Sequence, residues 1–142
     1  YYKCKEKIGI LYSKLKNSRK YYIHKITKNI TDEYDIIVCE NLNTKSMIMK
    51  KELSKEISDA SFSEIIREIE YKSKYKQKYF YKVDRYYASS QECSRCGSKD
   101  KKYKDLSERK YKCTKCGNDL DRDINASINI MFEGLKMYVN GL

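Results

Sequence analysis

The stretch that decides the fold runs from residue 93 to residue 130 and reads CSRCGSKDKKYKDLSERKYKCTKCGNDLDRDINASINI. It contains two cysteine pairs, Cys93/Cys96 and Cys113/Cys116, with the spacing C-x2-C-x16-C-x2-C. A two-residue gap lets a tight turn direct both sulfurs at one ion, and a glycine after each pair accommodates that turn. The spacing predicts one zinc ion held by four thiolates. Four protein ligands leave no position for water, so this zinc is predicted to be structural rather than catalytic.

Two disulfides are the alternative use of these four cysteines. Nothing in the sequence indicates an oxidising compartment, and a reducing one favours the metal. The other two cysteines, Cys4 and Cys39, lie far from this spacing and are predicted to be free thiols, with Cys39 buried in a strand.

Helical and strand patterns alternate outside the cysteine segment. Apolar residues follow helical spacing over residues 1–30 and 62–76, and again from Ile124 onward. Residues 34–39 are a short β-branched apolar run typical of a buried strand, and residues 79–84 are a second run rich in aromatics. The order of helix, strand, helix, strand, cysteine insert and helix favours an α/β fold class whose sheet is only partly represented.

Two of the helical patterns make specific predictions about which side chains share a face. In the first helix the apolar positions are Ile8, Leu11, Tyr12, Leu15, Tyr22, Ile23, Ile26 and Ile30. In the last helix the residues predicted to share one face are Ile124, Ile128, Met131, Leu135 and Tyr138.

Composition points to a polyanionic partner. The 142 residues suffice for one ordinary domain with a core, and they include 31 basic and 20 acidic side chains, a formal charge of +11. Nucleic acid is the commonest polyanion for such a chain. The alternatives are an acidic membrane surface, a generally lysine-rich protein, and an AT-rich genome that favours lysine codons.

No apolar run approaches the roughly 20 residues of a membrane span, and no secretory signal is visible. We therefore expect a cytoplasmic, nucleic-acid-associated location and no membrane partner.

Acidic residues occur at two element boundaries. Glu40 ends the first predicted strand, and carboxyl ends of strands in open α/β sheets are where sites form, although a solvated strand end is the simpler interpretation. Asp121 and Asp123 precede the last helix, where either could cap free backbone N–H groups. The small residues Ala126 and Ser127 would allow another element to approach this helix closely.

Three segments together resemble the carboxyl-terminal part of TnpB, a protein encoded by one class of bacterial insertion sequences. They read IIVCENLN at 36–43, YYASSQECSRCGSKD at 86–100 and YKCTKCGNDLDRDINASINI at 111–130. TnpB is an RNA-guided DNA endonuclease with a RuvC-like, RNase H-type domain. The resemblance implies a partial RNase H-like (RuvC-like) domain with an inserted four-cysteine zinc ribbon. Its segments would be the partial nuclease domain at 1–88, the ribbon at 89–118 and the closing helix of the nuclease domain at 119–142.

The resemblance also assigns roles to the acidic residues. Glu40 and Asp123 match the family's catalytic acids and would bind a catalytic Mg2+ or Mn2+, while Asp121 matches a position outside the metal shell. DNA would be a partner, with a guide RNA in the full-length family. The resemblance implies a further aspartate on an Asp-x-Gly strand ahead of the first helix, and we expect the chain to be truncated before this strand.

We therefore expect a carboxyl-terminal fragment of such an endonuclease that is inactive alone. The alternative is a non-catalytic zinc-ribbon protein that binds nucleic acid, such as a repressor or a decayed transposon product.

Overall fold

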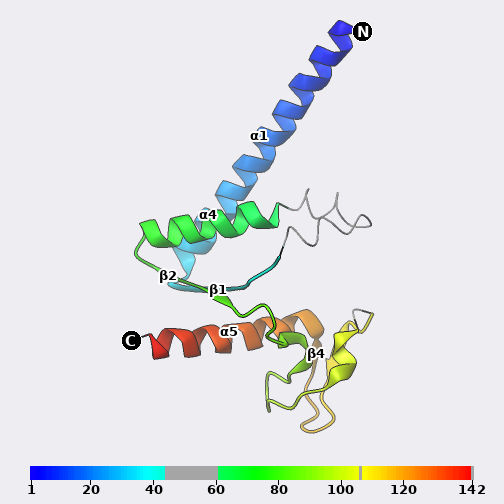
Figure 1. Ribbon diagram of the computed structural model, residues 1–142, viewed down its shortest axis with the longest axis vertical. Coiled ribbons are helices and arrows are strands. Elements are labelled where there is room, and N and C mark those ends of the chain that lie inside the picture. The colour runs from blue at the N-terminus through cyan, green and yellow to red at the C-terminus, as the bar shows by residue number, and fades with distance from the viewer. Residues whose placement is uncertain (44–60, 106, 142) are drawn as a thin grey trace. The chain divides into compact units, whose positions relative to one another are not determined.

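The computed structural model describes residues 1–43, 61–105 and 107–141 (Figure 1). The chain divides into two compact units. The first comprises residues 1–36 and 43–80, and the second comprises residues 37–42 and 81–142. The segment boundaries expected at residues 88 and 118 describe functional parts rather than packing units, and they stay a prediction.

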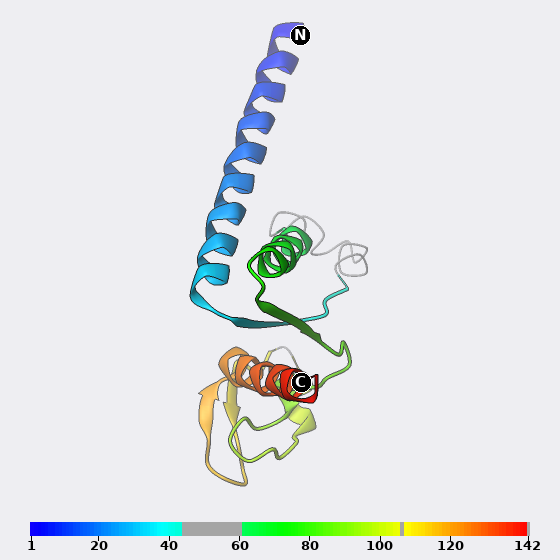
Figure 2. The same ribbon diagram turned by 90° about the vertical axis from the view of Figure 1, so that its left-hand side faces the viewer.

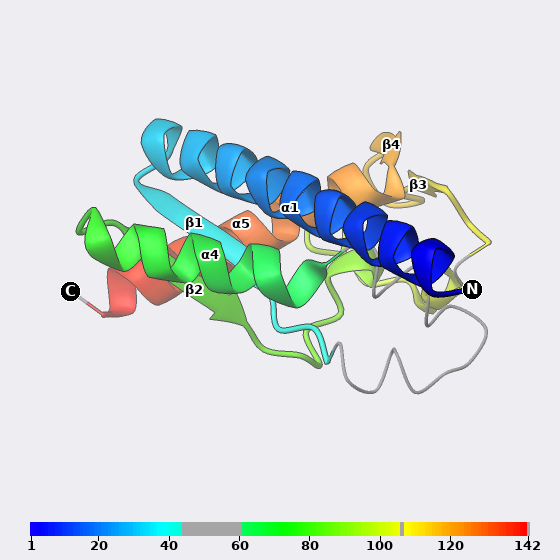
Figure 3. The same cartoon turned by 90° about the horizontal axis from the view of Figure 1, so that it is seen from above.

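Two helices make up most of the first unit. Helix α1 spans Tyr2–Glu33 and helix α4 spans Phe62–Tyr75, so both predicted helices are confirmed. The two helices pack against each other (Figure 3). Their buried residues are Ile23, Thr27 and Thr31 on α1 and Ile69 and Ser73 on α4. Three of these five side chains are small and hydroxylated, so the contact between the helices is close but poor in apolar area.

Lysines from α4 complete this contact with hydrogen bonds. The Lys72 ammonium donates to the His24 carbonyl at 2.9 Å and to the Thr27 hydroxyl at 2.6 Å. One turn later, Lys76 donates to the Thr31 hydroxyl at 2.8 Å. Burial lowers the pKa of Lys72, the expected result when an ammonium group leaves water. Polar groups therefore hold the two helices together where an apolar seam would be usual.

The N-terminal half of α1 extends beyond α4 (Figure 2). Every residue from 1 to 22 is exposed, including five of the apolar positions with helical spacing. These five are Ile8, Leu11, Tyr12, Leu15 and Tyr22. The helical spacing thus marks the helix correctly but does not mark a face that is buried within the described residues. Within that described part of the chain, no helix is long and apolar enough to cross a membrane.

The two predicted strands are confirmed and are hydrogen-bonded neighbours. Strand β1 spans Ile36–Glu40 and strand β2 spans Tyr79–Val83. Val83 is 1% exposed and Ile37 is 9% exposed. Cys39 is half-buried, less enclosed than the sequence predicts, in a sheet that has two strands among the described residues.

The second unit contains the cysteine segment and the last helix. Two short 3-10 turns, η2 (Ser89–Gln91) and η3 (Lys101–Lys104), precede strands β3 (Lys110–Lys112) and β4 (Asp119–Asp121). The two strands are antiparallel, with Tyr111 opposite Leu120. Helix α5 follows directly and spans Arg122–Asn140, two residues longer at its start than predicted.

Helix α5 buries a different face from the one expected. Its buried residues are Arg122, Asn125, Asn129 and Gly134. The predicted apolar face is mostly open, since Ile124, Met131 and Leu135 are exposed and Ile128 and Tyr138 are half-buried. The physical reason is that backbone carbonyls and a close strand meet this helix, and these neighbours select amides and a glycine rather than large apolar side chains.

The close approach to α5 occurs at Gly134. A Cβ atom on Gly134 would lie 2.2 Å from the Val38 side chain of β1, a distance that no real side chain tolerates. The contact expected at Ala126 and Ser127 is therefore found farther along the helix. Ser127 is exposed and donates its hydroxyl to its own helix, at the carbonyl of Ile124.

A four-cysteine cluster and an acidic strand end

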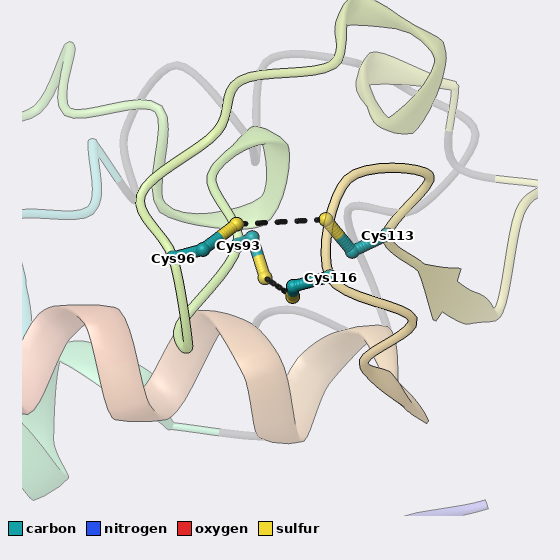
Figure 4. A group of neighbouring side chains, drawn as sticks. All are labelled: Cys93, Cys96, Cys113 and Cys116. Atoms are coloured by element: carbon teal, nitrogen blue, oxygen red, sulfur yellow. Dashed lines mark hydrogen bonds between the residues drawn. The ribbon is translucent and has the colours of Figure 1, made fainter.

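The four paired cysteines converge on one point (Figure 4). Their sulfur atoms all lie within 4.8 Å of one another. The Cys93–Cys116 and Cys96–Cys113 sulfur distances are both 3.7 Å. A tetrahedron with Zn–S bonds of about 2.3 Å has edges of about 3.8 Å. No disulfide joins any of the six cysteines. The cluster therefore has the size and the donor atoms that a tetrahedral zinc ion requires.

The two cysteine turns have the same backbone construction. Gly97 has φ of 70° and donates its N–H to the Cys93 carbonyl at 2.8 Å. Gly117 has φ of 72° and donates to the Cys113 carbonyl at 3.0 Å. A positive φ is the conformation that glycine adopts without steric cost. The role predicted for the glycine after each pair is thus confirmed.

The thiols of this cluster cannot all be charged without a cation. The Ser98 hydroxyl lies 3.2 Å from the sulfurs of Cys96 and Cys113, and with backbone N–H groups it lowers the pKa of Cys113 to about 6. The same hydroxyl lowers the pKa of Cys96. At Cys116 the Asn118 N–H also favours the thiolate, but burial and the neighbouring thiols outweigh it and raise the pKa to about 12. A bound cation would remove this repulsion and allow four thiolates.

Two tyrosines form most of the core beside the cluster. The rings of Tyr103 and Tyr111 are 4.1 Å apart between centroids, and both residues are buried. The Tyr103 hydroxyl donates to the Lys112 carbonyl at 2.9 Å and accepts from the Lys112 N–H at 2.8 Å. This small aromatic core, with the cysteines themselves, is the main apolar contribution to the ribbon.

Glu40 is at the end of β1, as predicted, and its side chain is held at one oxygen. Its Oε1 accepts a hydrogen bond from the Ser89 hydroxyl at 3.2 Å. Glu40 is exposed, whereas Ser89 is 6% exposed. The strand end is therefore solvated, but it is not unconstrained. Sequence reasoning did not identify Ser89, which precedes the first cysteine turn by four residues and has no motif of its own.

The two aspartates at the start of α5 have different partners. Asp121 is the N-cap, and its carboxylate accepts from the N–H groups of Asp123 at 2.8 Å and Ile124 at 3.3 Å. The Asp123 side chain is 77% exposed and lies 3.7 Å from the Arg122 guanidinium. Capping therefore accounts for Asp121 and leaves the Asp123 carboxylate facing solvent.

Arg122, between these aspartates, is a structural residue. Its side chain is 8% exposed, and Nη1 donates to the Asp105 carbonyl at 2.8 Å. Its backbone N–H donates to the Arg109 carbonyl at 2.8 Å. These bonds attach the start of α5 to the segment before β3, so this basic side chain is not directed at a solvent phosphate.

Helical geometry relates Asp123 to the strand that ends at Glu40. Gly134 meets Val38, and Asp123 precedes Gly134 by close to three full turns at 3.6 residues per turn, so both lie on one face of α5. Val38 and Glu40 share one face of β1, because side chains alternate along a strand. Ser89 is hydrogen-bonded to both Glu40 and Asn129. Asn129 is five residues before Gly134, which places it roughly 7.5 Å closer to the start of α5 along the helix axis. From Val38 to Glu40, β1 thus runs towards the end of α5 that carries Asp123.

The donor atoms of these two residues suit a hard divalent cation. Carboxylate oxygens are preferred ligands for Mg2+ and Mn2+, which also retain several water ligands. Both side chains are exposed, so water has access to them. Two carboxylates are, however, a small ligand set for a pair of metal ions.

A family model matches about half of the chain. Residues 62–130 match the TNB domain of the Cas12f1-like family. The match includes α4, β2, the cysteine ribbon and the first half of α5.

Curated relatives align with nearly the whole chain. A protein of Streptomyces pristinaespiralis named "Putative RNA-guided DNA endonuclease" is 30% identical over 133 residues, which are 94% of this chain and 33% of the relative. A protein of Escherichia coli K12 named "Putative RNA-guided DNA endonuclease InsQ" is 30% identical over 93% of this chain and 36% of the relative. TnpB-like protein L79 of Acanthamoeba polyphaga mimivirus is 30% identical over 84% of this chain. The chain spans about a third of the length of the first two relatives.

A solved structure has the same fold over most of the chain. The cryo-EM structure of a Cas12f1–sgRNA–target DNA complex contains a chain that is 27% identical, with a TM-score of 0.65 over 87% of this chain and 36% of that one. The predicted fold class, an α/β RuvC-like domain with an inserted four-cysteine ribbon, is thereby confirmed. By these sequence and structural similarities, the chain belongs to the TnpB family and corresponds to the region that carries the TNB domain.

Proposed function

We propose that this chain supplies the carboxyl-terminal part of an RNA-guided DNA endonuclease: a structural zinc ribbon, two metal-binding carboxylates and a surface for nucleic acid. The observation that carries the proposal is the contact of Gly134 with Val38, because it joins the helix whose first turn contains Asp123 to the strand that ends at Glu40. Membership of the TnpB family supports the reaction class.

In this proposal Glu40 and Asp123 hold Mg2+ or Mn2+ at the phosphate to be cut. When bound, a pair of such ions supplies an activated water and compensates charge on the leaving oxygen. Glu40 is oriented by the Ser89 hydroxyl, and Asp123 by its place in the first turn of α5. Two carboxylates bind metal weakly, so we propose that the chain alone does not cleave DNA. Loss of one essential electrostatic contact commonly costs about a hundred- to a thousand-fold in rate.

A metal-binding measurement tests the carboxylate assignment. The affinity of the zinc-loaded chain for Mn2+ can be measured by electron paramagnetic resonance. This affinity should fall at least about tenfold in Glu40→Gln and in Asp123→Asn, since each variant removes a charged ligand. Asp119→Asn is the matched control, because Asp119 is an exposed aspartate just before the same helix. Equal Mn2+ affinity in all four proteins would contradict the site and would favour the non-catalytic zinc-ribbon alternative.

A cleavage assay tests inactivity. With Mg2+ and single- or double-stranded DNA, the chain should release no more product than Asp123→Asn. Cleavage that disappears in Asp123→Asn would refute the proposed inactivity while supporting the site.

We further propose that nucleic acid lies along α1. Exposed lysines lie along its N-terminal half. A pocket of about 560 Å³ beside the start of α4 is lined by Tyr12, Lys16 and Lys20 among others. Phosphate contacts make log affinity fall linearly with log salt, by roughly 0.7–0.9 per contact. Replacing Lys14, Lys16 and Lys20 by glutamine should lower both the affinity for a single-stranded oligonucleotide and this slope. A slope unchanged from the parent chain would exclude α1 from the contact.

A further inference from the structure

The ribbon and the acidic helix are connected by two buried amides. Asn125 is fully buried and Asn129 is 4% exposed. Both side-chain NH2 groups donate to one acceptor, the Glu92 carbonyl, at 2.6 Å and 2.7 Å. Asn125 also accepts from the Ser94 N–H at 2.9 Å, and Asn129 also donates to the Ser89 carbonyl at 2.8 Å. Two side chains one turn apart on α5 therefore hold the segment 89–94, which leads into the first cysteine turn.

The same segment orients Glu40. The Ser89 carbonyl accepts a hydrogen bond from the Asn129 side chain, and the Ser89 hydroxyl donates one to the Glu40 carboxylate. Its neighbour along the segment, Glu92, precedes Cys93, a member of the cysteine cluster that is 1% exposed. Hydrogen bonds and short backbone stretches thus form a continuous path from the cluster, through segment 89–94, to the Glu40 carboxylate and to α5, whose first turn contains Asp123.

We propose that Asn125, Asn129 and Ser89 are positioning residues that make the geometry of the Glu40–Asp123 pair depend on a folded, metal-loaded ribbon. We call these three residues the amide latch. The physical basis is that a ribbon with so small an apolar core needs its metal to fold, and that buried amides with unmet partners are costly. When the ribbon unfolds, segment 89–94 loses its shape, and Ser89 no longer holds the Glu40 oxygen. This inference rests on the proposed function, because it concerns the same two carboxylates.

Isosteric variants test the latch without changing side-chain volume. Asn125→Asp and Asn129→Asp each remove NH2 donors to the Glu92 carbonyl, and Asn140→Asp makes the same change at an exposed position at the far end of α5. Each adds one negative charge, which on its own would strengthen binding of a cation. We expect Mn2+ affinity to fall about 10- to 100-fold in the two latch variants, as is typical for residues that orient metal ligands. It should not fall in Asn140→Asp, and zinc content should remain about one ion per chain in all three.

Ser89 provides a second variant that leaves the latch amides in place. Ser89→Ala removes only the hydroxyl bonded to Glu40 and keeps the carbonyl that accepts from Asn129. Mn2+ affinity should fall, and Ser89→Thr, which retains a hydroxyl, should restore it. A purely structural role for Ser89 would not produce rescue that follows the hydroxyl.

Coupling to the ribbon is tested by combining the variants with zinc removal. Mn2+ affinity of the parent chain should fall when the protein is prepared without zinc. In Asn129→Asp, zinc removal should lower Mn2+ affinity much less, because two changes that act through one path are not additive. The latch would be overturned if zinc removal lowered Mn2+ affinity equally in the parent chain and in Asn129→Asp. It would also be overturned if Mn2+ affinity depended on Glu40 but did not change with zinc removal or with either asparagine variant.

Hydrogen–deuterium exchange separates failure of the latch from failure of the proposed function. If Mn2+ binding does not depend on Glu40 or Asp123, the proposed function fails. The latch is then judged by exchange at residues 37–42 and 122–130, which should increase on zinc removal and in both asparagine variants. Exchange in α4 is the internal control and should not change. Unchanged exchange at 37–42 after zinc removal would overturn the latch by itself.

Discussion

The helix pair of the first unit and the ribbon of the second are both poor in apolar core, but they are stabilised in different ways. Between α1 and α4, small hydroxylated side chains allow close packing and lysines bond across the contact. In the ribbon, Cys93, Cys113 and the half-buried Cys116 pack with two tyrosines in the buried cluster. The helix pair is bonded by side chains of the chain itself, whereas the ribbon brings together four sulfur atoms that can bind a metal ion. We therefore predict that the ribbon, and not the helix pair, requires a metal ion to fold.

Zinc removal should have the largest effect, and it should be confined to one side of this comparison. Structural zinc sites have apparent binding energies of roughly 10–16 kcal/mol, which is at least as large as the stability of many whole domains. Protein purified without added zinc should contain about one ion per chain, and Cys93→Ser should contain nearly none. Metal analysis and amide exchange check both points, with exchange rising in residues 93–121 and unchanged in α1 and α4. A parent chain without metal, with its cysteines in disulfides, would contradict the zinc assignment.

Truncation of the aromatic core should rank second. Tyr111 is 1% exposed and packs against the Tyr103 ring, so Tyr111→Ala should destabilise the ribbon by about 3–5 kcal/mol. The Tyr111 hydroxyl makes only a long bond, 3.4 Å to the Ser98 carbonyl, so Tyr111→Phe should cost about 1 kcal/mol or less. Zinc affinity, measured by competition with a chromogenic chelator, should fall in the alanine variant alone. Equal losses in both variants would show that the hydroxyl, not the ring, stabilises the ribbon.

On the other side of the comparison, Thr27→Val should weaken the helix pair. Thr27 is fully buried, and its hydroxyl accepts from the Lys72 ammonium at 2.6 Å. Valine has the same shape but no acceptor, which leaves a partly desolvated charge with one partner fewer and costs about 1–3 kcal/mol. Exchange should rise across α1 and α4, with zinc content unchanged as the internal control. A rise confined to the ribbon would contradict the assignment of this threonine to the helix pair.

The smallest predicted effect is a pH dependence confined to the helix pair. Hydrogen bonds from Lys76 and then Lys28 lower the pKa of Asp32 from 3.8 to about 2. A lowered pKa in the folded state means that the carboxylate stabilises the fold above about pH 4, and that this contribution disappears as the pH falls towards 2. Asp32→Asn should remove this part of the acid sensitivity of α1. Circular dichroism between pH 5 and pH 2 measures it, and identical acid transitions for the parent and variant chains would contradict the prediction.

The elements and the cysteine cluster could be predicted from the sequence because they depend on local pattern. Helical spacing located α1, α4 and α5 to within a few residues, and the paired spacing with its two glycines identified the ligands of the cluster before any geometry was known. The capping role expected for one of two aspartates is confirmed for Asp121. The roles of Glu40 and Asp123 as metal ligands stay predictions.

Tertiary structure decided which faces are buried and which residues connect the site. Apolar spacing on α5 pointed to Ile124 and Met131, yet the helix buries Asn125 and Asn129, because its neighbours are backbone carbonyls of segment 89–94. Gly134 could have been noticed as a glycine within a helical pattern, but its partner Val38 lies almost a hundred positions away in the chain. Periodicity records how often a side chain returns to a face. It does not record what that face meets, because the partner comes from a distant segment and is known only once the chain has folded.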